Sequence, residues 1–120
     1  MILVKSVSEY KGEQLQKIVS SDATLLLLAR LDGRIIGSLT LALFQIPTGL
    51  RAWIEDVVVD GSARGAGAGE ALNTFAINES RKRGATTIDL TSRPSREAAN
   101  RLYQRLGFVQ RDTNVYRFTL

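Results

Sequence analysis

The sequence predicts an α/β fold, with a mixed (α+β) sheet and helices on its faces, in a single domain over residues 1–120. Apolar runs joined by short turns fill the first half, which is typical of an antiparallel meander. In the second half, apolar residues at helical spacing alternate with a short strand. A chain of 120 residues suits one domain and leaves little room for two.

Turn signals divide the first half into its elements. Asp32–Gly33 separates two apolar runs, and this dipeptide is among the strongest short-range signals of a hairpin. Three strands joined by hairpin turns make the meander. The expected elements are a strand at 2–7, a helix at 9–20, two strands within 24–44, a turn at 46–49 and a strand at 50–60.

Glycines delimit the two helices expected in the second half. The first helix begins near Gly67 and ends at Gly84, and the second opens at Pro94 and Ser95 and ends at Gly107. Ser95 is the expected N-cap. The buried stripes are Ala68, Ala71, Leu72, Phe75 and Ala76 in the first helix and Ala99, Leu102, Tyr103 and Leu106 in the second. Strands are expected at 86–92, 108–111 and 115–120, the last two flanking a turn at 112–114.

Composition excludes several chemistries. The chain has no cysteine and no histidine, which rules out disulfides, the usual zinc sites, a cysteine nucleophile and a histidine base. No metal is therefore expected. Any general acid or general base must be Asp, Glu, Tyr, Lys or water. No apolar stretch is long enough to span a bilayer and no secretory signal is evident, so we expect a cytoplasmic protein without membrane contact.

The net charge of +4 favours anionic ligands or partners. Nucleic acid, a phosphorylated cofactor and nothing specific all fit such a charge. The basic residues are scattered along the chain, with 81–83 as the only tight run, so nucleic acid is not favoured.

Three glycines on alternate positions, Gly65, Gly67 and Gly69, follow Arg64 between an expected strand and an expected helix. A turn of this kind presents the first amides of the helix, and the positive end of its dipole, to an anion. A backbone without side chains lets a diphosphate approach closely. One glycine would serve a tight turn, so three of them and an arginine favour a phosphate cradle.

Two familiar phosphate motifs fit this loop poorly. A P-loop is disfavoured because no Lys-Ser/Thr pair follows Gly69. A dinucleotide-binding protein is a weaker alternative, because Glu70 stands at the third position of that fingerprint. Asp89 does lie about twenty residues further on, where a ribose ligand would be.

The stretch "RGAGAG" (64–69) resembles the R-x-x-G-x-G/A signature of the GNAT superfamily of N-acetyltransferases. The stretch "AANRLYQRLGF" (98–108) resembles the family's second signature, a helix ending in Tyr-x-x-x-Gly-Phe. The resemblance runs from about Leu25 to Leu120. It implies the acyl-CoA N-acyltransferase fold and an enzyme that moves an acetyl group from acetyl-CoA to a primary amine. The amine would attack directly, through a tetrahedral intermediate.

The resemblance also places acetyl-CoA on this chain. The glycine loop would bind the diphosphate, and the strand before it would splay from its neighbour and bind the pantetheine arm. An N–H left unpaired by the splay would stabilise an oxyanion. Arg96 stands where the family often has asparagine, and it would pair with phosphate or face solvent. The implied cofactor residues are Val57, Val58, Val59, Arg64, Gly65, Ala66, Gly67, Ala68, Gly69 and Arg96.

Tyr103 matches the family tyrosine that protonates the departing CoA thiolate. The attacking amine also needs a base, and Glu55 and Asp56 are the candidates in a chain without histidine. Neighbouring side chains of a strand point to opposite faces, so only one of the two faces the cleft. Glu55 shares parity with Val57 and Val59, and we predict Glu55. Trp53, on the Glu55 face, lines the acceptor pocket or belongs to the core.

The chain departs from the family at its N-terminal side, where one helix is expected and the family usually has two. The acceptor site is then more open or is completed by a second subunit, so a homodimer is one expectation. A non-catalytic CoA-binding module with the same fold is the alternative function. The acceptor would be a small-molecule or peptide amine, and the sequence does not separate an N-terminal amine, a lysine, a polyamine and an antibiotic amine.

Overall fold

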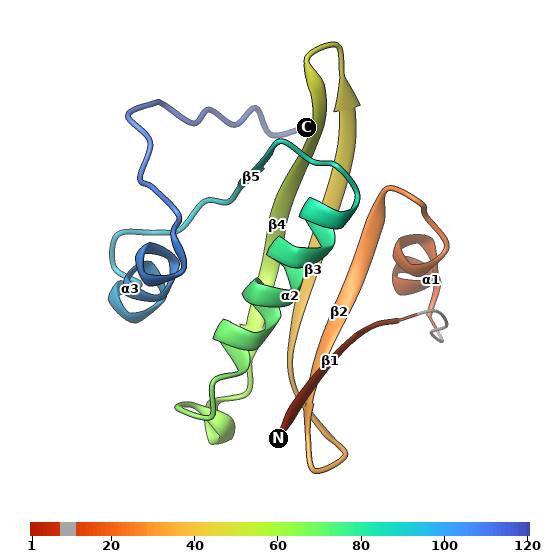
Figure 1. The fold of residues 1–120 in the computed structure, drawn as a ribbon, viewed down its shortest axis with the longest axis vertical. Coiled ribbons are helices and arrows are strands. Elements are labelled where there is room, and N and C mark those ends of the chain that lie inside the picture. Colours follow the sequence, from red (N-terminus) through yellow and green to blue (C-terminus); the bar gives the residue numbers. More distant parts are fainter. Residues whose placement is uncertain (8–11) are drawn as a thin grey trace.

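The structure, a computed structural model, describes residues 1–7 and 12–120, without the side chain of Gln14. Five strands form one sheet in the order β1-β2-β3-β4-β5 (Figure 1). Strands β1 to β4 pair antiparallel, and β5 pairs parallel with β4, so the predicted mixed sheet is confirmed. The elements are β1 (Ile2–Ser6), α1 (Glu13–Val19), β2 (Thr24–Leu31), β3 (Arg34–Ile46), β4 (Gly49–Val59), η1 (Gly61–Ala63), α2 (Ala68–Lys82), β5 (Thr87–Asp89) and α3 (Glu97–Leu106).

The meander of β2, β3 and β4 is also confirmed. Asp32 and Gly33 both have positive φ, 51° and 80°, as a two-residue type I′ hairpin turn requires. Pro47 and Thr48 make the second turn, between β3 and β4. The long strands therefore lie side by side and carry the rest of the molecule.

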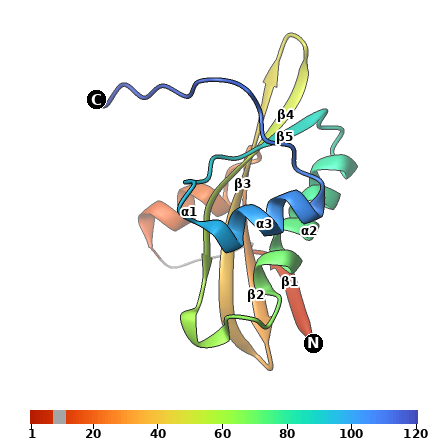
Figure 2. The ribbon, with the colours of Figure 1, turned by 90° about the vertical axis from the view of Figure 1, so that its left-hand side faces the viewer.

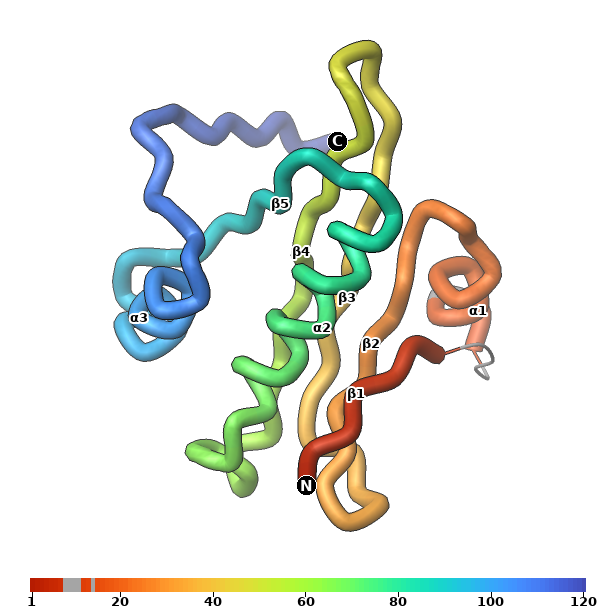
Figure 3. Tube along the Cα trace, viewed as in Figure 1, coloured from red at the N-terminus to blue at the C-terminus, as the bar shows by residue number. Residues whose placement is uncertain are grey.

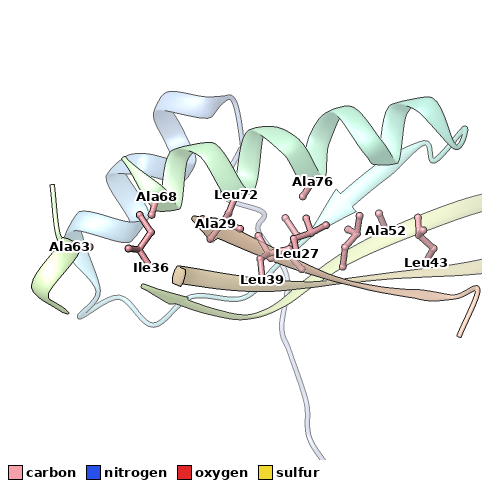
Figure 4. Packing of buried hydrophobic residues seen from close by; sticks show 12 residues of the cluster. Leu27, Ala29, Ile36, Leu39, Leu43, Ala52, Ala63, Ala68, Leu72 and Ala76 are labelled. Atoms are coloured by element: carbon pink, nitrogen blue, oxygen red, sulfur yellow. The ribbon is translucent and has the colours of Figure 1, made fainter. Parts of the chain in front are cut away.

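Helix α2 covers one face of the sheet and α1 lies on the other (Figure 2). The α2 face holds the main core, in which leucines of β2 and β3 meet small residues of the helix (Figure 4). Leu27, Leu39 and Leu72 are fully buried there. Burying one such side chain contributes roughly 1.5–3 kcal/mol. This packing fixes the start of α2 against the end of β4.

Helix α3 lies beyond β5, on the side of the molecule away from β1 (Figure 1). Its predicted stripe is confirmed, since Ala99, Leu102 and Leu106 are half-buried and Tyr103 is buried. The predicted N-cap was wrong, because Arg96 and not Ser95 precedes the first helical residue. A turn in which the Arg96 N–H donates to the Arg93 carbonyl oxygen (3.0 Å) moves the helix start one residue along the chain.

Three other boundaries differ from the expectations. The first residues of the helix expected at 9–20 lie outside the described residues, and α1 begins at Glu13. Of the strand expected at 86–92, only Thr87–Asp89 pairs with β4. The strands expected at 108–111 and 115–120 are wrong for this structure, because residues 107–120 form none. The end of that segment leads away from the body of the protein (Figure 2), and no backbone hydrogen bond joins residues 109–120 to β5.

Candidate functional site

Strands β4 and β5 separate halfway along β4. They pair at Arg51 with Thr87, Ala52 with Ile88 and Trp53 with Asp89, and the pairing ends there. Strand β4 continues to Val59 and stays paired with β3. The backbone of residues 54–59 therefore has no partner on its β5 side. The splay that the resemblance implied is present in the structure.

A groove of about 650 Å³ lies between the separated strands. One wall is residues 54–58 of β4, and the other is the chain that follows β5. Tyr103 of α3 also lines it. The groove brings together five predicted site residues from two distant parts of the sequence, namely Glu55, Val57, Val58, Arg96 and Tyr103.

A β-bulge at Asp56 changes which side chains of β4 share a face. Glu55 pairs with Thr40 and Val58 pairs with Ser38, so two residues of β4 oppose one residue of β3. Asp56 has φ +50°, which is rare outside glycine. Thr40 and Ser38 lie on one face of β3, and directly paired residues share a face. Glu55 and Val58 therefore lie together.

The predicted alternation across this segment was wrong for that reason. Val57 and Val59 pack against the core under α2, whereas Glu55 is exposed on the opposite face. The extra residue of the bulge reverses the pattern between Glu55 and Val57. Parity with the valines no longer supports Glu55 as the base.

Glu55 is instead held by its neighbour on the same face. The Trp53 indole N–H donates to Glu55 Oε1 at 2.7 Å. This bond keeps the carboxylate at the mouth of the groove, beside the point where β4 and β5 part. Trp53 is half-buried and also lines a second, larger hollow of about 1060 Å³ on the outer side of β5. It is therefore a wall residue and not a member of the main core.

Tyr103 lies where the two hollows meet, and it lines both of them. Its side chain is only 7% exposed and packs edge-to-face against Phe108, with ring centroids 5.8 Å apart. Gly107, at φ +106°, ends α3 and lets the Phe108 N–H donate to the Tyr103 carbonyl oxygen at 2.9 Å. The Gly-Phe pair after the helix thus fixes the tyrosine ring.

The glycine loop follows the open end of β4 and turns back into α2 (Figure 3). Gly65 and Gly67 have φ of +85° and +87°, a region that favours glycine. The first intrahelical bond of α2 runs from the Ala71 N–H to the Gly67 carbonyl oxygen. The amides of Ala68 to Glu70 are therefore left without an intrahelical partner, as at any helix start.

Gly69 has a different reason to be glycine. A Cβ there would lie 3.3 Å from Leu102 Cδ2, so the residue lets α2 and α3 approach each other. An exposed contact between Arg105 and Glu70 (3.5 Å) joins the same two helices. The three glycines therefore have different roles. Gly65 and Gly67 allow the loop conformation, and Gly69 allows the close contact between α2 and α3.

Asp60 anchors the loop to the sheet. Its N–H donates to the Ile36 carbonyl oxygen at 2.8 Å, and its Oδ1 accepts from the Ser62 N–H at 3.0 Å. Hydrogen bonds from the Ser62 backbone and side chain, together with the charge of Arg34, lower the pKa of the Asp60 carboxyl below its usual range. The carboxylate is the form that caps η1.

The two predicted arginines are both exposed. Arg64 ends η1 at the entry to the loop, and Arg96 precedes α3 and lines the groove. Both guanidinium groups are therefore available to an anion lying along the groove and loop. No group of three or more acidic side chains that could hold a metal ion occurs in residues 1–7 and 12–120. No described helix is both long and apolar enough to cross a membrane.

Several groove residues escaped the sequence analysis. Ser92 lines both hollows, and its hydroxyl is buried without a hydrogen-bond partner among the described residues. Asn100 holds this wall, because its Nδ2 donates to the Arg93 carbonyl oxygen at 2.9 Å. One signal for them was available in the sequence. A hydroxyl-rich run after a parallel strand marks the carboxyl edge of the sheet, where ligands bind in α/β folds.

The comparisons with known proteins agree with this geometry. Residues 4–108 match the Acetyltransferase (GNAT) family. The chain is also similar to glucosamine 6-phosphate N-acetyltransferase of Trypanosoma brucei brucei, with 43% identity over 79 residues. That match takes in 63% of this chain and 52% of the other, so the chain spans about half the length of the curated relative.

Two solved structures show the same arrangement of elements. A transcriptional regulator from Bacillus halodurans C-125 is 29% identical, with a TM-score of 0.79 over 89% of this chain and 73% of that one. AAC(6')-Iy, in complex with the bisubstrate analogue CoA-S-monomethyl-acetylneamine, is 13% identical, with a TM-score of 0.83 over 100% and 99% of the two chains. At such low identity the second likeness shows the fold alone.

Proposed function

Because the chain belongs to the GNAT family of acetyltransferases, we propose that it is an acetyl-CoA-dependent N-acetyltransferase that acts on a primary amine. One observation carries the proposal more than any other. The groove between the separated strands β4 and β5 contains Tyr103 and leads along the open edge of β4 toward the glycine loop. A long ligand with an anionic end fits such a site.

The residues of the groove and loop suit acetyl-CoA. The amides of Ala68 to Glu70 have no intrahelical partner and lie at the positive end of the α2 dipole, where a diphosphate binds well. Arg64 and Arg96 add positive charge from two sides. Val57, Val58 and Val59 offer their unpaired backbone edge to the pantetheine arm. When bound, acetyl-CoA supplies the thioester that the amine attacks.

Three groups of this chain would assist that attack. An unpaired N–H of β4 would stabilise the negative charge that develops on the acyl oxygen. Tyr103 would donate a proton to the departing thiolate, because it lies in the groove and its role follows the family motif. Glu55 would accept a proton from the amine, directly or through water. Its hydrogen bond to Trp53 supports this role in place of the parity argument.

The acceptors to test first are amino sugars and aminoglycosides. The curated relative is named for glucosamine 6-phosphate, and the complex of AAC(6')-Iy contains an acetylneamine analogue. The net charge of +4 favours a phosphorylated amino sugar over a polycationic aminoglycoside. We also propose a homodimer, a single-domain organisation and a cytoplasmic location.

Tyr103→Phe tests the chemistry separately from binding. Loss of the proton donor should lower kcat by about 10²–10⁴-fold, while the Kd for acetyl-CoA measured by calorimetry stays within about threefold. Tyr116→Phe is the matched control, because it also removes a tyrosine hydroxyl, but from an exposed side chain near the C-terminus. It should leave both constants unchanged.

Three outcomes would contradict parts of this proposal. If the wild-type protein shows no calorimetric heat and no thermal stabilisation with acetyl-CoA, the cofactor assignment is wrong. If it binds acetyl-CoA but acetylates no member of a broad amine panel read by mass spectrometry, the protein is a non-catalytic CoA-binding module. Equal loss of binding and turnover in Tyr103→Phe would assign that residue a packing role.

A further inference from the structure

Glu70 is an acidic residue in a loop that otherwise suits an anion. It lies in the first turn of α2, and its side chain is 54% exposed. A carboxylate and a diphosphate repel each other at short range. The position of the Glu70 side chain therefore matters for the cofactor site proposed above.

A glutamate at this place in a helix has an internal alternative. The third residue of a helix commonly reaches back and accepts a hydrogen bond from the N–H of the N-cap residue. The N-cap of α2 is Gly67, and the N–H groups of residues 67–70 have no backbone acceptor within residues 1–7 and 12–120. A Glu70 carboxylate that folded back would occupy the amides that a diphosphate needs.

The structure places the carboxylate elsewhere, beside α3. Glu70 Oε2 lies 3.5 Å from Nη2 of Arg105, in the last turn of that helix. The helices meet where a Cβ on Gly69 would lie 3.3 Å from Leu102 Cδ2. Leu102 and Arg105 are three residues apart and share a face of α3. The approach that Gly69 allows therefore brings the guanidinium group opposite Glu70.

The contact between Glu70 and Arg105 is an exposed ion pair, since the arginine side chain is 61% exposed. Exposed pairs contribute little to the free energy of unfolding. A weak contact can still select between two positions of a side chain when neither position costs much. The pair is therefore better suited to placing the carboxylate than to stabilising the fold.

We propose that Arg105 is a positioning residue for the cofactor loop, which holds the Glu70 carboxylate away from the amides of residues 67–70. The loop is then open to the diphosphate of acetyl-CoA. Without the guanidinium group, the carboxylate folds back in a fraction of the molecules. The apparent Kd then rises in inverse proportion to the fraction that stays open. The effect on acetyl-CoA rests on the function proposed above, whereas the position of Glu70 does not.

A double-mutant cycle of the full-length protein, measured by calorimetry with acetyl-CoA, tests this role. Arg105→Gln should raise the Kd about fivefold, because fewer molecules are open. Glu70→Ala removes the carboxylate and should bind at least as tightly as the wild type. Glu70→Ala/Arg105→Gln should bind within about twofold of Glu70→Ala, because the arginine then has no carboxylate to hold.

Arg101→Gln is the control for charge. Arg101 lies one turn earlier on α3, is also exposed and forms no ion pair with the residues that the structure describes. Its variant loses the same charge from the same helix and should keep the Kd within about twofold. All four variants should keep the wild-type circular dichroism spectrum and a melting temperature within about 3 °C, because the pair is exposed.

Three binding results would overturn the proposal. The same loss of affinity when Arg105→Gln is made in Glu70→Ala means that the arginine contacts the cofactor itself. An equal loss in Arg101→Gln means that the total charge of α3, and not the pair, sets the affinity. An unchanged Kd in Arg105→Gln means that Glu70 does not compete for the loop.

Nuclear magnetic resonance of the ligand-free protein tests the position of Glu70 directly. In Arg105→Gln the Gly67 amide should exchange with solvent at least about threefold more slowly than in the wild type, because the carboxylate accepts its hydrogen. Glu70→Ala/Arg105→Gln should restore the faster exchange. Unchanged exchange in Arg105→Gln overturns the positioning role. A wild type that does not bind acetyl-CoA, with the exchange rates in the expected order, contradicts the proposed function and not the position of Glu70.

Discussion

The two halves of β4 differ in one respect that organises the whole molecule. Residues 51–53 pair with β3 on one side and β5 on the other, whereas residues 54–59 pair with β3 alone. Both halves keep a face under α2, since Ala52 and Ile54 are buried and Val57 and Val59 pack against the core. The open half is therefore held at its β3 edge and on its α2 face, whereas its other edge and its other face are exposed. A rigid strand with one free edge is a suitable platform for a ligand.

The open half differs from the closed half in its backbone as well. The bulge at Asp56 increases the local twist and places Val58 on the same face as Glu55, away from α2. Asp60 then anchors the end of the strand to Ile36 before the glycine loop begins. The comparison teaches that the site depends on where β4 and β5 separate, and not on a change in the residue composition of β4.

Ile54→Ala gives the largest expected effect on this comparison. Ile54 opens the free half yet is only 3% exposed, so its truncation should lower the free energy of unfolding by about 2–5 kcal/mol. Val58→Ala, four residues on and 59% exposed, should change it by no more than about 0.5 kcal/mol. Urea denaturation measures both. Similar losses at the two positions would mean that the faces of the open half are not distinct.

Gly67→Ala tests whether the loop beyond the open half binds the cofactor. Gly67 has φ +87°, and Gly84, at the far end of α2, has φ +86° with open space around it. Alanine at either position should therefore lower the free energy of unfolding by about 1–2 kcal/mol. Only Gly67→Ala should also weaken acetyl-CoA binding, by about tenfold in calorimetry. Equal binding by both variants would remove the loop from the cofactor site.

Asp60→Asn gives the smallest effect, and it depends on pH. The pKa of the Asp60 carboxyl is lowered in the folded protein, so its stabilising contribution is complete above the ordinary aspartate pKa of about 3.9. That contribution is lost as the pH falls through the lowered value. Asp60→Asn should therefore be slightly less stable than the wild type at pH 7, and the difference should vanish in strong acid.

Asp60→Ala separates the charge from the hydrogen bond. Asparagine still offers an acceptor to the Ser62 N–H but carries no charge, whereas alanine offers neither. We expect Asp60→Ala to be less stable than Asp60→Asn, while the difference between the wild type and Asp60→Asn narrows in acid. Thermal unfolding between pH 7 and pH 3 measures these differences. A gap between wild type and Asp60→Asn that widens in acid would contradict the assignment.

Much of this arrangement was predictable from local chemistry. Asp32–Gly33 predicts its hairpin because the turn type needs two positive φ values. The spacing of Ala68, Leu72 and Ala76 predicts the buried stripe of α2, and all three are buried. The order of a glycine loop and a Tyr-x-x-x-Gly-Phe helix predicts the family, which the match over residues 4–108 confirms. The cofactor and catalytic roles of single residues stay predictions.

The failures that concern strands share one cause, which is dependence on a partner strand. The prediction that Glu55 and Val57 share a face is wrong because of the bulge at Asp56. A bulge depends on how β4 pairs with β3, and no glycine in the sequence indicates this one. The strands expected at 108–111 and 115–120 fail because alternation shows that a segment suits a strand, not that a neighbour is within reach.

Local sequence patterns specified the hairpins, the helix faces, the family and the order of the elements as far as α3, since these depend on side-chain period and on residues close together along the chain. The tertiary structure alone decided where β4 leaves β5, which face carries Glu55 and that Tyr103 reaches the groove from a helix more than forty residues further on. It also decided that residues 109–120 form no strand with their own sheet. These outcomes depend on pairing between distant segments, whose hydrogen bonds and packing no local pattern specifies.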